Sequence, residues 1–394
     1  MNALSLASQP EPHEAGYSRQ RAWVEVDTEA IARNAATLAA GLAPGCQLMA
    51  VVKADGYGHG AVPVARAALA GGASSFGVAT LAEGVQLRRA GITAPVLVLG
   101  NLIHPDELRS CLRWQLMPTL SGMREALLCQ NLAAAAGRPI SVHLKLDTGM
   151  TRLGIDWQEG PRLVAAIAEL DDVQLQGVYS HLANADALPA DDGGITASQV
   201  QRFESVLASL KQQQLDAGCR HLANSAATLR GHTFHYDMVR VGLALYGHSP
   251  AAHLAASSAL EPAMQLRARV SLIRAVAAGI GVSYGHRFRT SRPSRLAVIS
   301  IGYADGVPRQ LSGQITVLHQ GRHLPQVGAI TMDQLVVDAT DAPDLDAGEV
   351  VTLLGQDGDQ VITPADWSLR CQTIPWEILC GFKHRLPRLP LGAH

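Results

Sequence analysis

The chain has 394 residues, of which 47% are hydrophobic and 17% are charged, and its formal net charge is −2. This length predicts two domains, or a large barrel with a smaller domain, and the hydrophobic content is enough for a large core. A near-neutral chain with no run of lysine and arginine has no basic surface, so we expect neither nucleic acid nor membrane as a partner.

Residues 1–20 contain no apolar segment, so we expect an N-terminal tail and no signal peptide. No apolar stretch reaches the roughly 18 residues that a transmembrane helix needs. The six cysteines include no C-x-x-C pair and are expected to be reduced thiols, and the histidines show no spacing typical of a metal site. Together these features predict a cytoplasmic protein without a metal.

Between Gln47 and Gly247, short β-prone runs alternate with helical patterns. The β-prone runs cover residues 47–53, 74–79, 95–100, 116–120, 140–146, 173–181, 220–224 and 237–246. Helical patterns between them include residues 81–90, 124–136, 162–170 and 197–214. Eight strands with crossover helices predict a (β/α)8 TIM barrel over residues 21–260. An open doubly wound sheet is the alternative, which the lack of G-x-G-x-x-G after the first strand disfavours.

After Pro262 the helical periodicity fades and the pattern becomes β-rich. Runs at residues 267–276, 295–301, 314–318, 334–338 and 350–354 are separated by turns rich in glycine and aspartate. This pattern predicts a separate all-β C-terminal domain over residues 261–394. The strand-like segment Ala22–Val26 precedes the barrel and is a candidate to pair with this domain.

The most informative motif joins an apolar strand to a lysine and a glycine-rich turn. Over residues 50–60 it reads AVVKADGYGHG, with the lysine at position 53. A lysine that is desolvated at the rim of a barrel can lose its charge and attack a carbonyl, which suggests Schiff-base chemistry. Taken alone, the motif is more often a solvated lysine at a strand end.

Other polar residues follow the later strands, at the end where barrel enzymes hold their catalytic groups. These residues are Lys145, Asp147 and Arg152 after the fifth strand, His181 after the sixth, Asn224 and Ser225 after the seventh, and Arg240 and Gly242 in the eighth. Ser225 is placed to cap a helix, and the loops after strands seven and eight of a barrel commonly bind phosphate. A Schiff-base lysine beside a phosphate site indicates pyridoxal 5′-phosphate (PLP), which carries both an aldehyde and a phosphate.

These motifs occur together with four more, at Ser283–Gly285, Gly302–Gly306, Gly328–Asp333 and Phe382–Arg388. The chain closely resembles the alanine racemases, two-domain barrel racemases that use PLP, from about residue 22 to about residue 390. Several such motifs in this order are specific, although each alone is weak. The resemblance implies interconversion of L- and D-alanine by a homodimer with shared active sites, supplying D-alanine for peptidoglycan.

The resemblance also implies a role for each matching residue. Lys53 would bind PLP covalently and act as one base, and Tyr284 from the partner subunit would be the other. Arg240 would donate to the pyridine nitrogen with His181 behind it, and Arg152 would contact the phenolic oxygen and the substrate carboxylate. In this family the lysine matching Lys145 is often carbamylated. The remaining implied contacts are Tyr57, Asn224, Ser225, Gly242, Leu243 and His384 for the cofactor, and Met332 and Tyr303 for the substrate.

The two-base assignment has a physical reason. A proton that leaves one face of Cα and returns to the other requires acid–base groups on both faces, and one side chain cannot easily reach both. An arginine at the pyridine nitrogen cannot readily protonate the ring, because its own pKa is too high. The resulting weaker electron sink would limit the build-up of a long-lived carbanion and thus side reactions.

One position departs from the family pattern and leaves alternatives open. Many members carry a tyrosine directly before the final Arg-Val/Leu-Pro-Arg, where this chain has His384. A shorter side chain that titrates near neutrality makes a broader racemase acting on serine the main alternative. A barrel-class PLP decarboxylase and a PLP-binding homeostasis protein are further alternatives, and the β domain with Tyr284 disfavours the latter. Lys145 could instead pair with Asp147, while His143 and His221 are expected to be ordinary core histidines.

Overall fold

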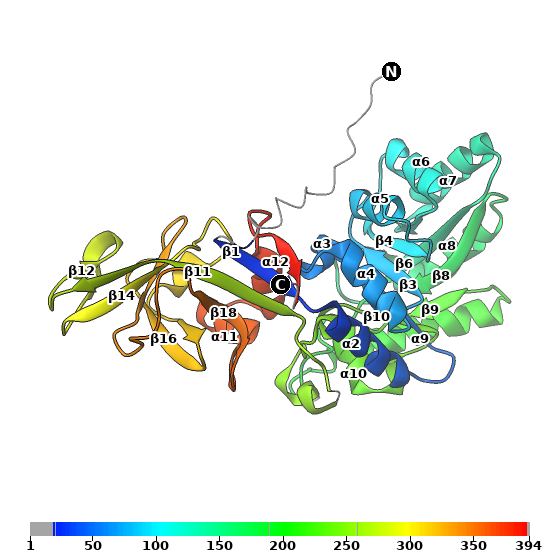
Figure 1. The fold of residues 1–394 in the computed structure, drawn as a ribbon. Coiled ribbons are helices and arrows are strands. Elements are labelled where there is room, and N and C mark those ends of the chain that lie inside the picture. Colours follow the sequence, from blue (N-terminus) through cyan, green and yellow to red (C-terminus); the bar gives the residue numbers. More distant parts are fainter. Residues whose placement is uncertain (1–18, 20, 189, 258, 392–394) are drawn as a thin grey trace, which may run out of the picture. The chain divides into compact units, whose positions relative to one another are not determined.

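The computed structural model describes residues 19, 21–188, 190–257 and 259–391. The chain divides into two compact units (Figure 1): residues 28–263 form a barrel unit, and the described residues on either side form a C-terminal unit. The predicted disordered tail, residues 1–20, lies outside the described residues except for Arg19.

The barrel unit contains a parallel sheet with strand order β10–β2–β3–β4–β5–β6–β8–β9, and β7 pairs with β6. Its strands are β2 (Gln47–Val51), β3 (Ser75–Val78), β4 (Val96–Asn101), β5 (Met117–Leu120), β6 (Ile140–Asp147), β7 (Ile155–Asp156), β8 (Val173–Tyr179), β9 (Cys219–His221) and β10 (Met238–Val241). Backbone hydrogen bonds from Asp237 N to Arg220 O and from Arg240 N to Ala223 O, both 3.0 Å, join the two ends of this sheet. The eight strands therefore close into a ring, which confirms the predicted (β/α)8 barrel.

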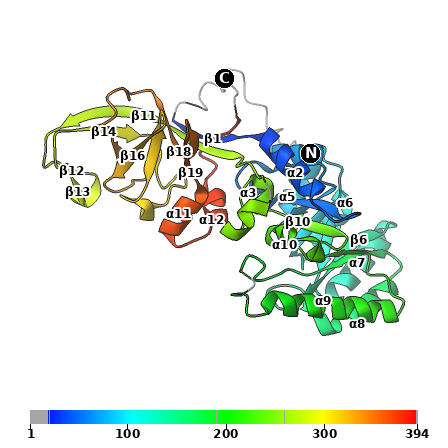
Figure 2. The same cartoon turned by 90° about the horizontal axis from the view of Figure 1, so that it is seen from below.

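Helices connect these strands and cover the outside of the ring (Figure 2). They are α2 (Thr28–Ala40), α3 (Lys53–Tyr57), α4 (Ala61–Ala70), α5 (Leu81–Arg89), α6 (Pro105–Trp114), α7 (Met123–Ala136), α8 (Gly160–Ala168), α9 (Ile195–Gln212) and α10 (Ser225–Arg230), with 3-10 turns η1 (Trp157–Glu159), η2 (His232–Phe234), η3 (Leu243–Tyr246) and η4 (Ala252–Ser257). Local signals set their ends: Thr80 and Glu83 form a capping box at the start of α5, and Gly137 ends α7 with φ 63°. The strands are buried on both faces, as in Val96–Val98, because helices cover the sheet.

The last predicted strand of the barrel, residues 237–246, is shorter in the structure. Strand β10 ends at Val241, and the chain turns into η3 directly after Gly242, whose φ is −106° and ψ is −95°. The apolar run that follows, Leu243–Tyr246, is wholly buried and was therefore indistinguishable from a strand by its pattern.

The C-terminal unit is built on a mostly antiparallel sheet with the order β19–β18–β15–β16–β17–β14–β11–β1–β20. Its strands are β1 (Ala22–Val26), β11 (Met264–Val276), β12 (Gly281–Val282), β13 (Phe288–Arg289), β14 (Ser294–Ile299), β15 (Thr316–His319), β16 (Arg322–Val327), β17 (Leu335–Asp338), β18 (Val350–Asp357), β19 (Gln360–Ile362) and β20 (Arg388–Pro390). The 13-residue strand β11 pairs with β18 and β1 through its first half and with β14 through its second half. The additional β11–β18 pairing closes six of these strands into a second ring.

Strand β1 belongs to this second sheet, as the sequence suggested. It runs antiparallel to β11 and parallel to β20, so Ala22–Val26 groups with the C-terminal unit although the predicted barrel domain began at residue 21. The unit also contains helices α11 (Pro364–Cys371) and α12 (Pro375–Gly381) and turns η5 (Tyr284–His286) and η6 (Arg309–Leu311). A capping box of Thr363 and Asp366 starts α11, so this mostly β domain contains helices that the sequence analysis had not placed.

Two findings concern the cysteines and the length of the apolar helices. All six cysteines are free. Within the described ranges, no helix combines the length and the apolar character that crossing a lipid bilayer requires.

Asn34 on α2 joins the first helix of the barrel unit to its last segment. The side chain is wholly buried, its Nδ2 donates to Leu245 O (3.1 Å) and Glu261 O (2.8 Å), and its Oδ1 accepts from Glu261 N (2.8 Å). We expect Asn34→Ala to lower the free energy of unfolding by about 2 kcal/mol, because one buried and two partly buried backbone groups lose their partner. Urea unfolding measures this change.

The matched control is Asn131→Ala, at an exposed position of α7. Its effect should stay within about 0.5 kcal/mol. Equal effects of the two substitutions would contradict the role given to Asn34.

Candidate active site

Lys53 lies just beyond β2, where the chain leaves the ring in a left-handed turn. The strand ends at Val51, two residues before the predicted end, and Lys53 begins α3. Ala54, Asp55 and Gly56 have φ angles of 52°, 52° and 61°. An L-residue in this conformation costs about 1–2 kcal/mol, so the surroundings must hold the turn in place.

Two carboxylates hold this turn. Glu83 on α5 accepts from Ala54 N (2.7 Å) with Oε1 and from Ala79 N (2.7 Å) with Oε2. Asp55 accepts from Ala61 N (2.9 Å) at the start of α4. Glu83 was not among the residues expected at the site; its capping position in T-x-x-E indicates a helix start, but not its bond to the lysine turn.

A group of hydrogen-bond donors lies where α10 and η3 begin. Ser225 Oγ accepts from Gly242 N (3.0 Å) and from Ala244 N (3.4 Å). The Tyr57 hydroxyl lies against Gly242 so closely that a Cβ at this glycine would collide with it. Leu243, the next residue, is buried and begins η3. Hydroxyls and the backbone N–H groups of a tight turn, two of which here donate to Ser225, are the kinds of group that bind phosphate.

The helix cap at this place differs from the predicted one. We expected Ser225 to cap α10, but Asn224 is the N-cap, with an extended backbone and Oδ1 accepting from Ala227 N (3.1 Å). Ser225 is the first helical residue. Its hydroxyl is therefore available to the turn at Gly242 instead of the helix.

Arg240 is a buried cation in β10, with 4% of its surface exposed. Its guanidinium donates to Ser180 O (2.7 Å) and Leu222 O (3.2 Å), and lies 3.2 Å from His181 Nδ1 and 3.1 Å from His221 Nδ1. Burial lowers the pKa of Arg240 to about 10, which keeps it charged at neutral pH. Because a guanidinium has no acceptor, both facing Nδ1 atoms must accept, and the neutral rings carry their proton on Nε2.

The buried contacts of Arg240 continue to a second histidine. His221 Nε2 donates to His143 Nδ1 (3.0 Å), and the Tyr179 ring stacks on His221 at 4.6 Å. Burial, and then the charge of Arg240, lowers the pKa of His143 to about 4 and that of His221 well below its usual range. Both are core histidines, as expected, yet they also orient Arg240, which sequence spacing could not reveal.

The charges of three cationic side chains act on Lys145 at this end of the ring. Burial, followed by the charges of Arg240, Arg152 and Lys53, lowers the pKa of Lys145 to about 8. The same four groups surround His181, whose pKa burial and these charges lower well below its usual range. A concentration of positive charge of this kind fits an anionic ligand.

Asp147 shapes the loop that carries Arg152. Its Oδ1 accepts from three backbone N–H groups at 2.9–3.0 Å, those of Gly149, Met150 and Thr151. The carboxylate therefore serves the loop, and its charge only partly offsets the factors that lower the pKa of Lys145. Arg152 itself is exposed.

Gln199 on α9 holds two loops of the site, although it was not among the residues expected there from the sequence. Only 1% exposed, it donates to His181 O (2.9 Å) and Thr148 Oγ1 (3.3 Å) and accepts from Ala183 N (2.8 Å). It thus ties the end of β8 to the Asp147 loop. A glutamine within an amphipathic helix carries no signal of such a role.

Tyr284, Tyr303, Met332 and His384 all lie in the C-terminal unit, on four different turns. Tyr284 is 73% exposed and Met332 53%. Tyr284 follows Ser283, whose φ of 60° and ψ of −170° are strained for a residue with a side chain.

Comparison with known proteins agrees with this arrangement. The family model described as "Alanine racemase, N-terminal domain" matches residues 26–250, and "Alanine racemase, C-terminal domain" matches residues 263–390. The chain belongs to the alanine racemase family. Family membership places the chain among the isomerases.

Individual members of the alanine racemase family are similar over almost the whole chain. The alanine racemase of Prochlorococcus marinus is 55% identical over 372 residues, which are 94% of this chain and 96% of that protein. The alanine racemase of Nostoc sp. is 51% identical over 98% of this chain and 99% of its own length. The crystal structure of alanine racemase from D-cycloserine-producing Streptomyces lavendulae has a TM-score of 0.88 at 39% identity, covering 95% of this chain and 98% of that one.

The buried histidines predict how stability depends on pH. Below about pH 6.5 the unfolded chain protonates its histidines, while His143, with a folded-state pKa of about 4, stays neutral. The unfolded state then binds more protons, so stability falls as the pH decreases from about 6.5 to 4. We expect this loss to reach about 3 kcal/mol from His143 alone, measured as a falling Tm.

His143→Gln keeps an acceptor for His221 and should flatten this decrease in Tm. His323→Gln, at an exposed position of β16, is the control and should leave the pH profile unchanged. A profile equally steep in both variants would refute the assignment to His143.

Proposed function

We propose that this protein interconverts L- and D-alanine with PLP as its cofactor. The observation that carries the proposal is the cluster of Lys53, Lys145, Arg152 and Arg240 beside the hydrogen-bond donors at Ser225 and Gly242. An amine, a phosphate site and a buried pyridine-nitrogen donor match the three functional groups of PLP. When bound, PLP supplies an electron sink that acidifies the Cα proton of the amino acid.

Different barrel residues would bind different chemical groups of the cofactor. Lys53 would hold the aldehyde carbon covalently, and Arg240 would donate to the ring nitrogen, with His181 behind it. Arg152 would contact the phenolic oxygen and the substrate carboxylate. The residues proposed for the phosphate are Tyr57, Asn224, Ser225, Gly242, Leu243 and, from the C-terminal unit, His384.

We assign proton transfer to two residues on opposite faces of the substrate. The Lys53 amine would take or return the Cα proton on one face, and the phenol of Tyr284 from a partner subunit would act on the other. The reference pKa of tyrosine is near 10, so its anionic form needs cations such as Arg152 nearby. Met332, through its backbone N–H, would contact the substrate from the same partner, and Tyr303 would bind the substrate where it enters the site.

A homodimer with shared sites is consistent with the exposure of Tyr284 and Met332, which a partner would cover. We further propose that the reaction takes place in the cytoplasm and supplies D-alanine for peptidoglycan. The substrate would be a small amino acid. The shorter side chain at His384 favours a second candidate, a broader racemase that also accepts serine.

Complementation tests the shared two-base site. We expect Lys53→Ala and Tyr284→Ala each to lower racemisation of alanine at least about 1000-fold, since each removes one base. The two inactive variants are then mixed, partly unfolded and reassembled. Hybrid dimers, which contain one intact site, should recover some turnover. Circular dichroism of L- and D-alanine solutions measures the rate.

Leu369→Ala, at a 77% exposed position of α11, is the control and should keep full activity. Retained activity of Tyr284→Ala would remove the second base, and failure of the mixture to recover turnover would refute the shared site. Comparison of kcat/KM for alanine and serine decides between the two candidate functions, a ratio near one favouring the broader enzyme.

We also propose that Lys145 is carbamylated. A pKa of about 8 leaves part of the amine neutral near neutral pH, so its nitrogen can attack CO2, forming an N–C bond and releasing one proton. The carbamate would place a negative charge among Lys53, Arg152 and Arg240 and would orient Arg152.

Nuclear magnetic resonance with 13C-labelled bicarbonate tests this modification. We expect a carbamate signal that grows as the pH rises through about 8, because the neutral amine is the reactive form. The signal should persist in Lys211→Ala, a control at an exposed lysine, and disappear in Lys145→Ala. Its absence from the unsubstituted protein at saturating bicarbonate would contradict the proposal.

A further inference from the structure

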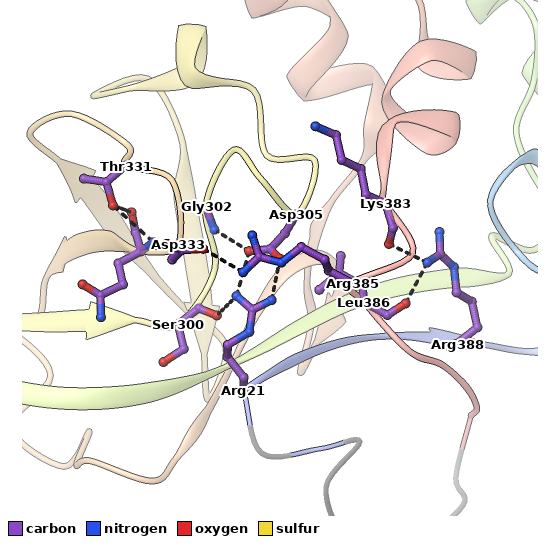
Figure 3. A network of polar contacts seen from close by, with 11 residues as sticks. Arg21, Ser300, Gly302, Asp305, Thr331, Asp333, Lys383, Arg385, Leu386 and Arg388 are labelled. Atoms are coloured by element: carbon purple, nitrogen blue, oxygen red, sulfur yellow. Dashed lines mark hydrogen bonds and ion pairs between the residues drawn. The ribbon is translucent and has the colours of Figure 1, made fainter. Parts of the chain in front are cut away.

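Asp305 is the centre of a chain of ion pairs in the C-terminal unit (Figure 3). Its carboxylate is wholly buried and receives Arg21 in a bidentate pair, with Nη1 to Oδ2 at 2.8 Å and Nη2 to Oδ1. Arg385 Nε lies 3.6 Å from Asp305 Oδ1, and Arg385 Nη2 lies 2.7 Å from Asp333 Oδ1. We call these four residues the Asp305 network.

The network joins segments that are far apart in the sequence. Arg21 precedes β1, Arg385 precedes β20, and Asp305 follows β14. Arg21 also donates to Ser300 O (3.1 Å), and Asp305 accepts from Gly302 N (3.0 Å). A buried carboxylate is tolerated only with such compensation, and here two guanidiniums from opposite ends of the chain provide it.

The loop that contains Asp305 is joined to the neighbouring loop through the backbone. Tyr303 N donates to Thr331 O (3.0 Å), and Ala304 N donates to Met332 O (3.0 Å). A Cβ at Gly302 would collide with both of these carbonyl groups. Loops 302–306 and 331–334 are therefore held together by backbone hydrogen bonds and close packing.

The turn that carries His384 is attached to the same piece. Lys383 N donates to Asp305 O (3.0 Å), and Arg388 Nη1 donates to Lys383 O (2.7 Å). On the other side of His384, Arg385 pairs with Asp305. His384 is exposed, but its neighbours on both sides are fixed.

We propose that the Asp305 network is a positioning device for substrate binding, which holds Tyr303, Met332 and His384 in fixed relative positions. The proposal rests on the proposed function, which assigns these three residues to the substrate and cofactor. Misplacing a binding group by about 1 Å can cost about 100-fold, so three contact residues on separate loops need a common anchor. Arg385, which links two of the loops to the turn, is a positioning residue and not a catalytic one.

Substitution of Arg385 in the PLP-loaded dimer tests this role. We expect Arg385→Gln to raise the KM for alanine about fivefold or more while kcat stays within about twofold, because ground-state and transition-state contacts are misplaced alike. Arg385→Lys keeps a charge for Asp305 but not the reach to Asp333, and should recover part of the loss. Arg322→Gln is the control, since Arg322 pairs with Asp344 and is 40% exposed, like Arg385.

Amide hydrogen exchange provides a readout that does not depend on activity. Exchange at Tyr303, Ala304 and Lys383 should be at least about tenfold faster in Arg385→Gln than in the control. If Arg385→Gln does not fold, Asp333→Asn at the exposed end of the network replaces it, with the same directions expected.

The outcomes separate this inference from the proposed function. Lack of alanine turnover by the unsubstituted dimer would refute the proposed function. Normal turnover by that dimer, together with an unchanged KM or unchanged amide exchange in the folded variants, would overturn the positioning role alone.

Discussion

A permanent positive charge buried inside the barrel constrains the candidate site more than any other feature. The guanidinium of Arg240 can only donate, so each of its N–H groups needs an acceptor in a place that water does not supply. The segment after β8 and the end of β9 provide four of these acceptors, the carbonyls of Ser180 and Leu222 and the Nδ1 atoms of His181 and His221. The same charge, added to burial, keeps the surrounding histidines neutral and so fixes which nitrogen of each ring carries the proton.

Both residues proposed as bases are attached to strained backbone. Lys53 begins a turn with left-handed residues, and Tyr284 follows Ser283 in a conformation that disfavours a side chain. Such strain persists only where surrounding contacts determine the geometry. Glu83 provides them for Lys53, and for the tyrosine turn the Ser283 hydroxyl donates to Ala329 O (2.7 Å). In each unit, hydrogen bonds from a neighbouring segment therefore hold the strained backbone next to Lys53 or Tyr284.

Both units contain a closed sheet, but the two sheets position side chains in different ways. The parallel ring gathers the ends of eight strands, so charges from distant parts of the sequence meet at one rim. The C-terminal unit instead closes its ring through the long strand β11 and joins both ends of its chain at the buried carboxylate of Asp305. The loops around Asp305 can therefore carry exposed side chains and still keep fixed positions relative to one another.

The sequence alone determined the barrel, the β-rich second domain and the place of Arg240 in β10, because hydrophobic periodicity and short motifs are local properties. It put Lys53 and His181 at strand ends, whereas β2 and β8 each stop two residues earlier. Helix capping by Asn224 and the helices after residue 363 depended on backbone geometry that the motifs did not reveal. The partners of Arg240 and Asp305 were decided only by tertiary structure. Arg21 and Asp305, for example, are 284 positions apart, and only strand order and register bring such groups into contact.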